Sequence, residues 1–128
     1  AAVKMGASRV RARDLDPAVL SEVRHNLELN DIGPGRVELE EGNLLDGMEG
    51  PVDLLTANII IEPLLDMLPS VPGILGEGGR ALFSGLLAKE REKFSSALGE
   101  QGLRIVDELV INDWWGVAAE RNDERSRR

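Results

Sequence analysis

The stretch Pro51–Leu65, PVDLLTANIIIEPLL, decides which fold this chain can adopt. Its first part, Val52–Leu55, is apolar enough to form a strand that is buried on both faces of a sheet. The strand ends at Asn58, and leucines recur at helical spacing after Pro63. This order of strand, polar residue and helix is typical of an open α/β sheet, in which ligands bind outside the carboxyl ends of the strands.

Asn58 is therefore the first candidate site residue, because it lies at the carboxyl end of a strand, where ligands bind in parallel sheets. A capping role fits it equally well, since asparagine is common in turns and its amide often caps the following helix. The stretch by itself leaves both roles open.

Composition narrows the kinds of site that the chain can hold. Its 128 residues suffice for one domain, and no apolar run approaches the ~20 residues of a membrane span. No signal peptide is visible, and we expect a cytoplasmic protein. With no cysteine and a single histidine, we expect neither a metal site nor a nucleophile of the Cys or Ser-His-Asp kind.

The net charge of −8 disfavours direct binding of nucleic acid, because an acidic surface repels phosphate groups. A cationic partner, such as a basic protein or a sulfonium cofactor, is electrostatically compatible with this charge. Solubility alone also explains it.

Asp14 is the second candidate site residue. The segment Val10–Arg13 is predicted to be a strand, and an acid at the end of such a strand can accept hydrogen bonds from both hydroxyls of a ribose. Asp16 and Pro17 then begin a helix as its N-cap and first residue. Asp16 thus has a structural role and Asp14 has none, which favours a binding role for Asp14.

A third candidate, Asn43, follows the next predicted strand. A helix over residues 18–30 and a strand over residues 36–40 lead to the loop that contains it. Gly42 would let a flat ring approach the backbone, and Asn43 could bond to the edge of a base. An ordinary Asx turn explains the same loop nearly as well. His25 lies beside the polar face of the helix and is predicted to be a surface residue.

The rest of the chain alternates helices and strands. Pro69 and Pro72 predict a kinked or two-piece helix after the central strand. A glycine turn at residues 76–79 precedes a strand at 80–84, whose carboxyl end shares the rim with the other candidates. A helix over residues 88–99 comes next.

Two final strands, over residues 103–111 and 114–119, must be antiparallel because the turn between them is too short for a crossover. Trp114 and Trp115 lie in the second of these strands. We expect them to pack in the core or at the sheet edge rather than to form a stacking platform.

The first strand of such a sheet is not visible in the given sequence. Residues 1–6 look like the end of a helix, and no strand with a glycine-rich cofactor loop precedes Val10. We predict an α/β, Rossmann-like, mostly parallel sheet with a C-terminal antiparallel hairpin, whose first strand and glycine loop are missing. Unpaired strand edges then result, so we expect a gap, a partner chain or homo-oligomer, or an altered sheet. Residues 122–128 are expected to be a frayed tail.

This order of elements resembles the class I S-adenosylmethionine-dependent methyltransferases. Within them it is similar to the PrmA-type family, which methylates a large-subunit ribosomal protein. The resemblance is carried by Asp14–Pro17, Ala57–Leu64, Gly78–Leu87 and Trp114. It runs over residues 1–121, which would be a partial catalytic domain.

The resemblance implies S-adenosylmethionine as the cofactor and a protein amino group as the methyl acceptor, most simply on a basic ribosomal protein. Carried over residue by residue, Asp14 would bind the ribose and Leu15 would lie among the cofactor contacts. Asn43 and Leu44 would lie beside the adenine. Asn58 would contact the methionine end and place the incoming amine, which makes it the catalytic residue. Asp14 and Asn58 are then expected to line one rim of the sheet.

Three other functions remain open at this point. The first is a methyltransferase that acts on another substrate. The second is a non-catalytic nucleotide-binding Rossmann fragment, such as part of a dinucleotide domain. The third is a non-catalytic remnant that only binds a partner. Asp14 permits the second, but Ala57–Pro63 and the final hairpin fit it poorly.

Overall fold

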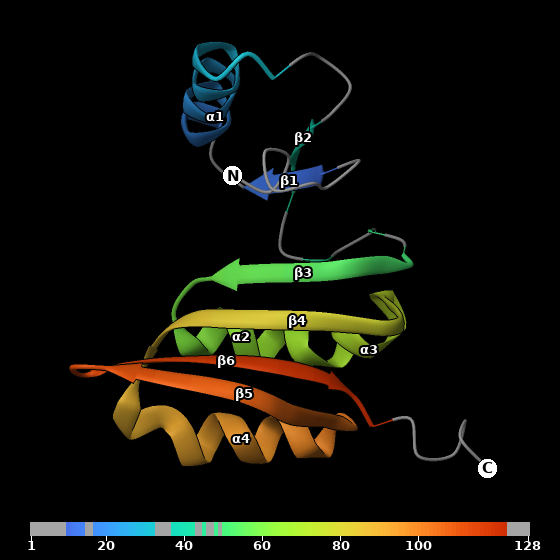
Figure 1. Cartoon of the computed structure of the whole chain (residues 1–128), viewed down its shortest axis with the longest axis vertical. Helices are drawn as coiled ribbons and strands as arrows, with labels where there is room; N and C mark the ends of the chain where they lie inside the picture. The colour runs from blue at the N-terminus through green and yellow to red at the C-terminus, as the bar shows by residue number, and fades with distance from the viewer. Residues whose placement is uncertain are drawn as a thin grey trace. The chain divides into compact units, whose positions relative to one another are not determined.

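A computed structural model describes residues 10–14, 17–32, 37–42, 45, 48 and 50–122 (Figure 1). The chain divides into two compact units, Ala1–Asp46 and Gly47–Arg128. The strands in the described part of the chain pair into two sheets rather than one, which confirms the expectation of an interrupted sheet. The helix predicted over residues 1–6 and the tail beyond residue 122 lie outside the described residues.

The first unit contains a β-α-β arrangement. Strand β1 (Val10–Asp14) pairs in parallel with β2 (Val37–Glu41), and helix α1 (Pro17–Leu29) connects them. Proline at the first helical position suits its fixed φ and missing N–H. Asp14 and Glu41, the last residues of the two strands, are register partners. The predicted strand, helix and strand are therefore confirmed within one or two residues at each end.

The second unit is built on a four-stranded sheet in the order β3-β4-β6-β5. Its strands are β3 (Val52–Asn58), β4 (Leu75–Leu87), β5 (Leu103–Ile111) and β6 (Trp114–Arg121). The pair β3–β4 is parallel, and β6 is antiparallel to both β4 and β5. Figure 1 shows the four strands side by side in this order. The predicted α/β class and antiparallel final hairpin are confirmed.

The connection from β3 to β4 is a helix in three pieces. They are α2 (Ile61–Met67), the 3₁₀ turn η1 (Leu68–Ser70) and α3 (Val71–Ile74). Pro69 is the second residue of η1 and Pro72 the second residue of α3, and proline cannot donate the backbone hydrogen bond that would continue the preceding α-helix. The predicted interruption of the helix is confirmed, although the helix has three pieces and not two.

A second helix covers the same face of the sheet. The 3₁₀ turn η2 (Ala88–Glu90) leads into α4 (Arg91–Glu100), which contacts α2 and β5. Phe94 of α4 meets the rings of Phe83 and Trp115 edge to face, with centroid separations of 5.3 and 6.2 Å. These rings and the buried aliphatic residues around them form the core of the second unit. Its largest fully buried side chains are Trp115, Phe83, Phe94, Leu64, Leu68, Leu75, Leu86, Leu98 and Val71.

Two sequence expectations about this sheet are wrong. Strand β3 is not buried on both faces: Leu54 is 53% exposed, and among the described residues β3 pairs with β4 alone. The glycine run is not a turn before β4 but lies inside it, since Val52 pairs with Leu75 and Leu54 with Arg80. The extra residues form an irregularity that brings the backbones close together. A side chain on Gly79 would come within 2.9 Å of the Val52 carbonyl oxygen.

Among the described residues, every helix is too short or too polar to cross a membrane.

Candidate functional site

A pocket of about 550 Å³ opens in the second unit where β3 ends. Its wall comes from all four strands of the sheet and from the two residues that follow β3. Most of the lining is apolar, and no charged side chain contributes to it among the described residues. The lining residues are Asn58, Ile59, Ile60, Ser84, Gly85, Leu109, Ile111, Trp114, Trp115 and Gly116.

Asn58 is the last residue of β3 and pairs with Ser84 of β4. The Ile59 N–H donates to the Ser84 carbonyl at 3.2 Å, which continues the pairing one step past the strand. The helix that follows has Ile60 as its N-cap, without any side-chain cap hydrogen bond. Asn58 therefore does not cap α2, and its exposed amide lies at the pocket.

Gly85 brings β4 close to this amide. Its φ is +85°, a conformation that L-residues rarely adopt. A side chain here would come within 2.7 Å of the Ile59 carbonyl oxygen and 2.9 Å of Asn58 Oδ1. Glycine is thus needed at this position for the backbone of β4 to pass beside the end of β3.

Two bulges shape the pocket around β6. In β4, Phe83 pairs with Val117 and Leu86 with Trp115, so two residues of β4 stand against Gly116 alone. In β5, the partner of Ile105 is Ala119 and that of Asp107 is Ala118, which leaves one extra residue between them. A bulge reverses the faces to which the following side chains point.

The bulge in β5 sends Leu109 and Ile111 to the pocket. These residues pair with Gly116 and Trp114, so all four share one face of the sheet. The side chains are well exposed: Leu109 is 63%, Ile111 58% and Trp114 57% exposed. An amide with a hydrogen-bond acceptor thus stands beside an apolar wall, an arrangement suited to a polar group at the end of an aliphatic chain.

The two tryptophans behave differently. Both border the pocket, but Trp115 is 1% exposed and its indole packs in the core, as expected, whereas Trp114 is 57% exposed. The expectation of core or edge packing is therefore wrong for Trp114. Consecutive residues of a strand point to opposite faces, so only one of the two can lie under the helices.

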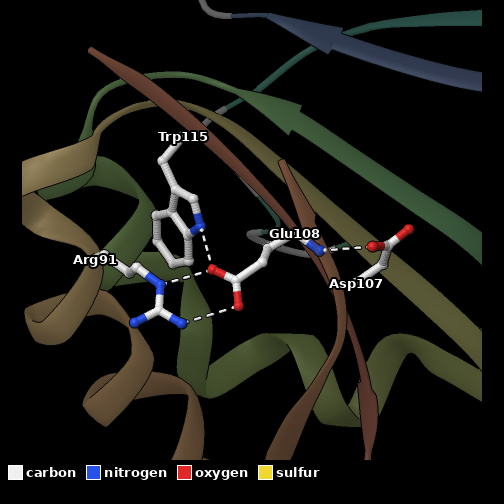
Figure 2. Close-up of polar contacts among 4 residues, drawn as sticks. All are labelled: Arg91, Asp107, Glu108 and Trp115. Atoms are coloured by element: carbon white, nitrogen blue, oxygen red, sulfur yellow. Dashed lines mark hydrogen bonds and ion pairs between the residues drawn. The ribbon is translucent and has the colours of Figure 1, made fainter. Parts of the chain in front are cut away.

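A polar cluster behind the pocket holds the Trp115 indole (Figure 2). Trp115 Nε1 donates to Glu108 Oε1 at 3.0 Å. Arg91 Nε donates to the same oxygen at 2.6 Å, and its second nitrogen reaches Glu108 Oε2 at 2.9 Å. The hydrogen bond from Arg91, and next the one from Trp115, lower the Glu108 pKa from 4.5 to about 2. Glu108 in turn raises the pKa of Arg91.

The sequence carries no signal that predicts this cluster. Arg91 opens a helix and Glu108 lies 17 positions later on a strand, with no spacing that links them. Two alternating strands without a bulge would also place Glu108 on the wrong face, so the pattern carried no usable signal.

The other predicted site residues belong to the first unit. Asp14 ends β1, as predicted, and pairs with Glu41 in register. Leu15, Asn43 and Leu44 lie outside the described residues. Because Asp14 and Asn58 belong to different units, their shared rim stays a prediction. His25 is exposed on α1, which confirms it as a surface residue.

Comparison with known proteins identifies one protein family. The family model described as ribosomal protein L11 methyltransferase (PrmA) matches residues 1–122. The ribosomal protein L11 methyltransferase of Bacillus subtilis (strain 168) is 35% identical over 121 residues, which make up 94% of this chain and 39% of that protein. The corresponding protein of Bacillus cereus (strain G9842) is 37% identical over 122 residues, 93% of this chain and 38% of that protein. The chain thus spans under two fifths of these relatives.

Solved structures agree with this result. The crystal structure of ribosomal protein L11 methylase from Lactobacillus delbrueckii subsp. bulgaricus has a TM-score of 0.89 and 33% identity, and covers 94% of this chain and 61% of that one. The structure of M. jannaschii TYW2 in complex with AdoMet, at 15% identity and a TM-score of 0.61, shares the fold over 88% of this chain and 56% of that one.

Proposed function

The chain belongs to the PrmA family of ribosomal protein L11 methyltransferases, and we propose that it carries the methyl-transfer site of an S-adenosylmethionine-dependent enzyme. The proposed acceptor is an amino group of that basic ribosomal protein, which would place the reaction in the cytoplasm. The family and the relatives' names support this assignment. The observation that carries it in the molecule is the Asn58 amide at the rim of an apolar pocket, at the carboxyl end of β3.

S-adenosylmethionine would supply an activated methyl group on a sulfonium, so the protein needs only to bind and orient the acceptor. An amine attacks through its lone pair and must therefore arrive neutral and in line. Asn58 can accept a hydrogen bond from one amine hydrogen and so aim the lone pair. No charged side chain among the described lining residues would stabilise an ammonium group, which favours the neutral amine.

The same wall suits the methylene groups of a long aliphatic amine. Trp114 and Ile111 face the pocket from the final hairpin, while Ile60 flanks it beyond β3. A lysine side chain would bury its apolar stem there and bring only its amine to Asn58. The net charge of −8 is also complementary to a basic protein.

The cofactor contacts in the first unit are part of the proposal. Asp14 at the end of β1, with Leu15 next to it, would bind the ribose, and Asn43 with Leu44 would lie beside the adenine. Support for these four comes from the family resemblance and, for Asp14, from its place at a strand end. Residues 1–121 would then form part of the catalytic domain.

Asn58→Ala in the full natural protein tests the catalytic assignment. The expected loss in kcat for methylation of the ribosomal protein is about 100-fold, the size of effect that a misplaced reacting group produces. Methyl transfer from labelled S-adenosylmethionine is the measurement. Asn26→Ala, which removes an exposed asparagine from α1, is the matched control and should keep full activity.

Three outcomes separate the possible functions. An Asn58→Ala protein that folds and still methylates contradicts the role of the amide. A wild-type protein that binds S-adenosylhomocysteine in calorimetry but leaves the ribosomal protein unmodified indicates another acceptor. Binding of NAD in place of S-adenosylhomocysteine would favour a dinucleotide domain.

A further inference from the structure

The hairpin of β5 and β6 carries part of the pocket wall, and the side chains at its end lie outside the core. At the hairpin end, Val110 is 53%, Ile111 58% and Trp114 57% exposed, whereas Trp115 is 1% exposed. Trp115 is therefore the outermost residue of β6 that the core holds. Beyond it, the hairpin tip is tied to the unit by the backbone hydrogen bond from Ala88 N–H to the Asp113 carbonyl, at 2.8 Å.

The Trp115 indole is itself held by the cluster behind the pocket. Figure 2 shows the indole N–H of β6 and the guanidinium of α4 both directed at the Glu108 carboxylate of β5. Helix α4 and both strands of the hairpin, β5 and β6, thus meet at the Glu108 carboxylate. Because Arg91 donates two hydrogen bonds to the Glu108 carboxylate, the orientation of that carboxylate is restricted. The indole that donates to the same carboxylate is restricted in turn.

The bulge in β5 links this cluster to the pocket. After the extra residue at position 106, Glu108 points to the helix face opposite Val117, and Leu109 points to the pocket opposite Gly116. Glu108 and Leu109 are neighbours on one strand, as are Trp115 and Trp114 on the other. Each residue of the cluster on the hairpin is thus followed or preceded by a residue that lines the pocket.

We propose that Glu108, clamped by Arg91 and bonded to Trp115, is a positioning residue that sets the distance of the hairpin wall from Asn58. This inference rests on the proposed function, because the wall would hold the stem of the acceptor amine. Loosening the cluster lets the hairpin end shift, so the acceptor binds less tightly while the Asn58 amide stays in place. The effect falls on KM for the protein substrate more than on kcat.

A second carboxylate in the same sheet provides the matched control. Glu120 of β6 also accepts from two arginines, Arg80 at 2.8 Å and Arg104 at 3.2 Å. Its arginine partners lower its pKa as Arg91 lowers that of Glu108. Glu120 lies at the other end of β6 and does not line or support the pocket. A general loss of sheet stability should affect both carboxylate variants alike, whereas a positioning role should appear at Glu108 alone.

The experiment compares Glu108→Ala, Glu108→Gln and Glu120→Ala in the full natural protein. Glu108→Ala should raise KM for the ribosomal protein roughly tenfold, a size consistent with a small misplacement of the acceptor, and leave KM for S-adenosylmethionine unchanged. Glu108→Gln keeps an oxygen that can accept from the indole, so it should restore most of the affinity. Glu120→Ala should leave both KM values unchanged.

An NMR measurement follows the cluster without relying on activity. The indole N–H resonance of Trp115, assigned by its loss in Trp115→Phe, should shift and exchange faster in Glu108→Ala but not in Glu120→Ala. If that resonance responds while KM for the ribosomal protein is equal in both alanine variants, the cluster is only structural and the inference is wrong. A wild-type protein that transfers no methyl group overturns the proposed function, and this inference with it.

Discussion

Trp114 and Trp115 are consecutive in β6 and lie on opposite faces of the sheet. The two faces of the second unit differ in their roles. Trp115 is 1% exposed, meets Phe94 edge to face and donates to Glu108. Trp114 is 57% exposed and lines the pocket. The face beneath α2 and α4 therefore supplies stability, and the other face supplies the candidate site.

Chemical similarity between neighbouring residues therefore says little about their roles in a sheet. Alternation assigns the two indoles to different faces, and the bulges in β4 and β5 decide which residues join each of them. The variants described next test this division between a stabilising face and a functional face.

The largest effect is expected from Trp115→Ala. Removing a fully buried indole from the core costs about 3–5 kcal/mol, because the transfer energy is lost and a cavity remains. Urea unfolding monitored by circular dichroism gives the free energy of unfolding. A loss as small as that of an exposed residue would show that the helix-covered face does not carry the stability.

Gly85→Ala should come next, with effects on both stability and activity. A positive φ costs an alanine about 1–2 kcal/mol, and the new methyl group would also press on Ile59 and the Asn58 amide. Gly102→Ala is the matched control, since Gly102 has a φ of +74° and nothing within 4 Å of its added Cβ. Urea unfolding and methyl transfer should show the larger loss in stability, and the only loss in kcat, at Gly85. Equal losses in the two variants would contradict the close approach of β4 to Asn58.

Trp114→Ala should leave stability within about 0.5 kcal/mol of wild type, because its indole is largely exposed. Under the proposed function it should still weaken methylation of the ribosomal protein, since it removes part of the apolar wall. Val110→Ala is the control, because Val110 is similarly exposed, at 53%, but does not line the pocket. If steady-state kinetics gave the wild-type KM for the ribosomal protein in both variants, the pocket-lining face would not be the functional one.

The smallest effect is a pH dependence at Glu108. Its pKa is lower in the folded chain than the ordinary 4.5, so its ionised form favours the folded state. The stabilisation is complete above pH 4.5 and is lost as the pH falls toward 2. The difference in unfolding free energy between wild type and Glu108→Gln should therefore shrink from neutral pH to about pH 3. A constant difference across that range would show that the ion pair with Arg91 does not form in solution.

Much of the fold could be predicted from residue patterns. Short-range signals, such as Pro17 at a helix start, Pro69 and Pro72 in a broken helix, and the tight turn at Asn112, indicated the elements correctly. They were wrong where burial depends on distant neighbours. Leu54 looks like a core residue in an apolar run, but it is 53% exposed, and its strand pairs with β4 alone in the described part of the chain.

Local spacing and turn chemistry were enough to predict the α/β class, the antiparallel hairpin and Asn58 as a candidate at the end of β3. Only in the packed molecule is it clear that Asn58 is not a helix cap, that Trp114 faces a pocket, and that Arg91, Glu108 and Trp115 meet. Local patterns could not predict these contacts because strand pairing and bulges set which face a side chain occupies. Partners far apart in the chain come together only when the sheet and its helices have packed.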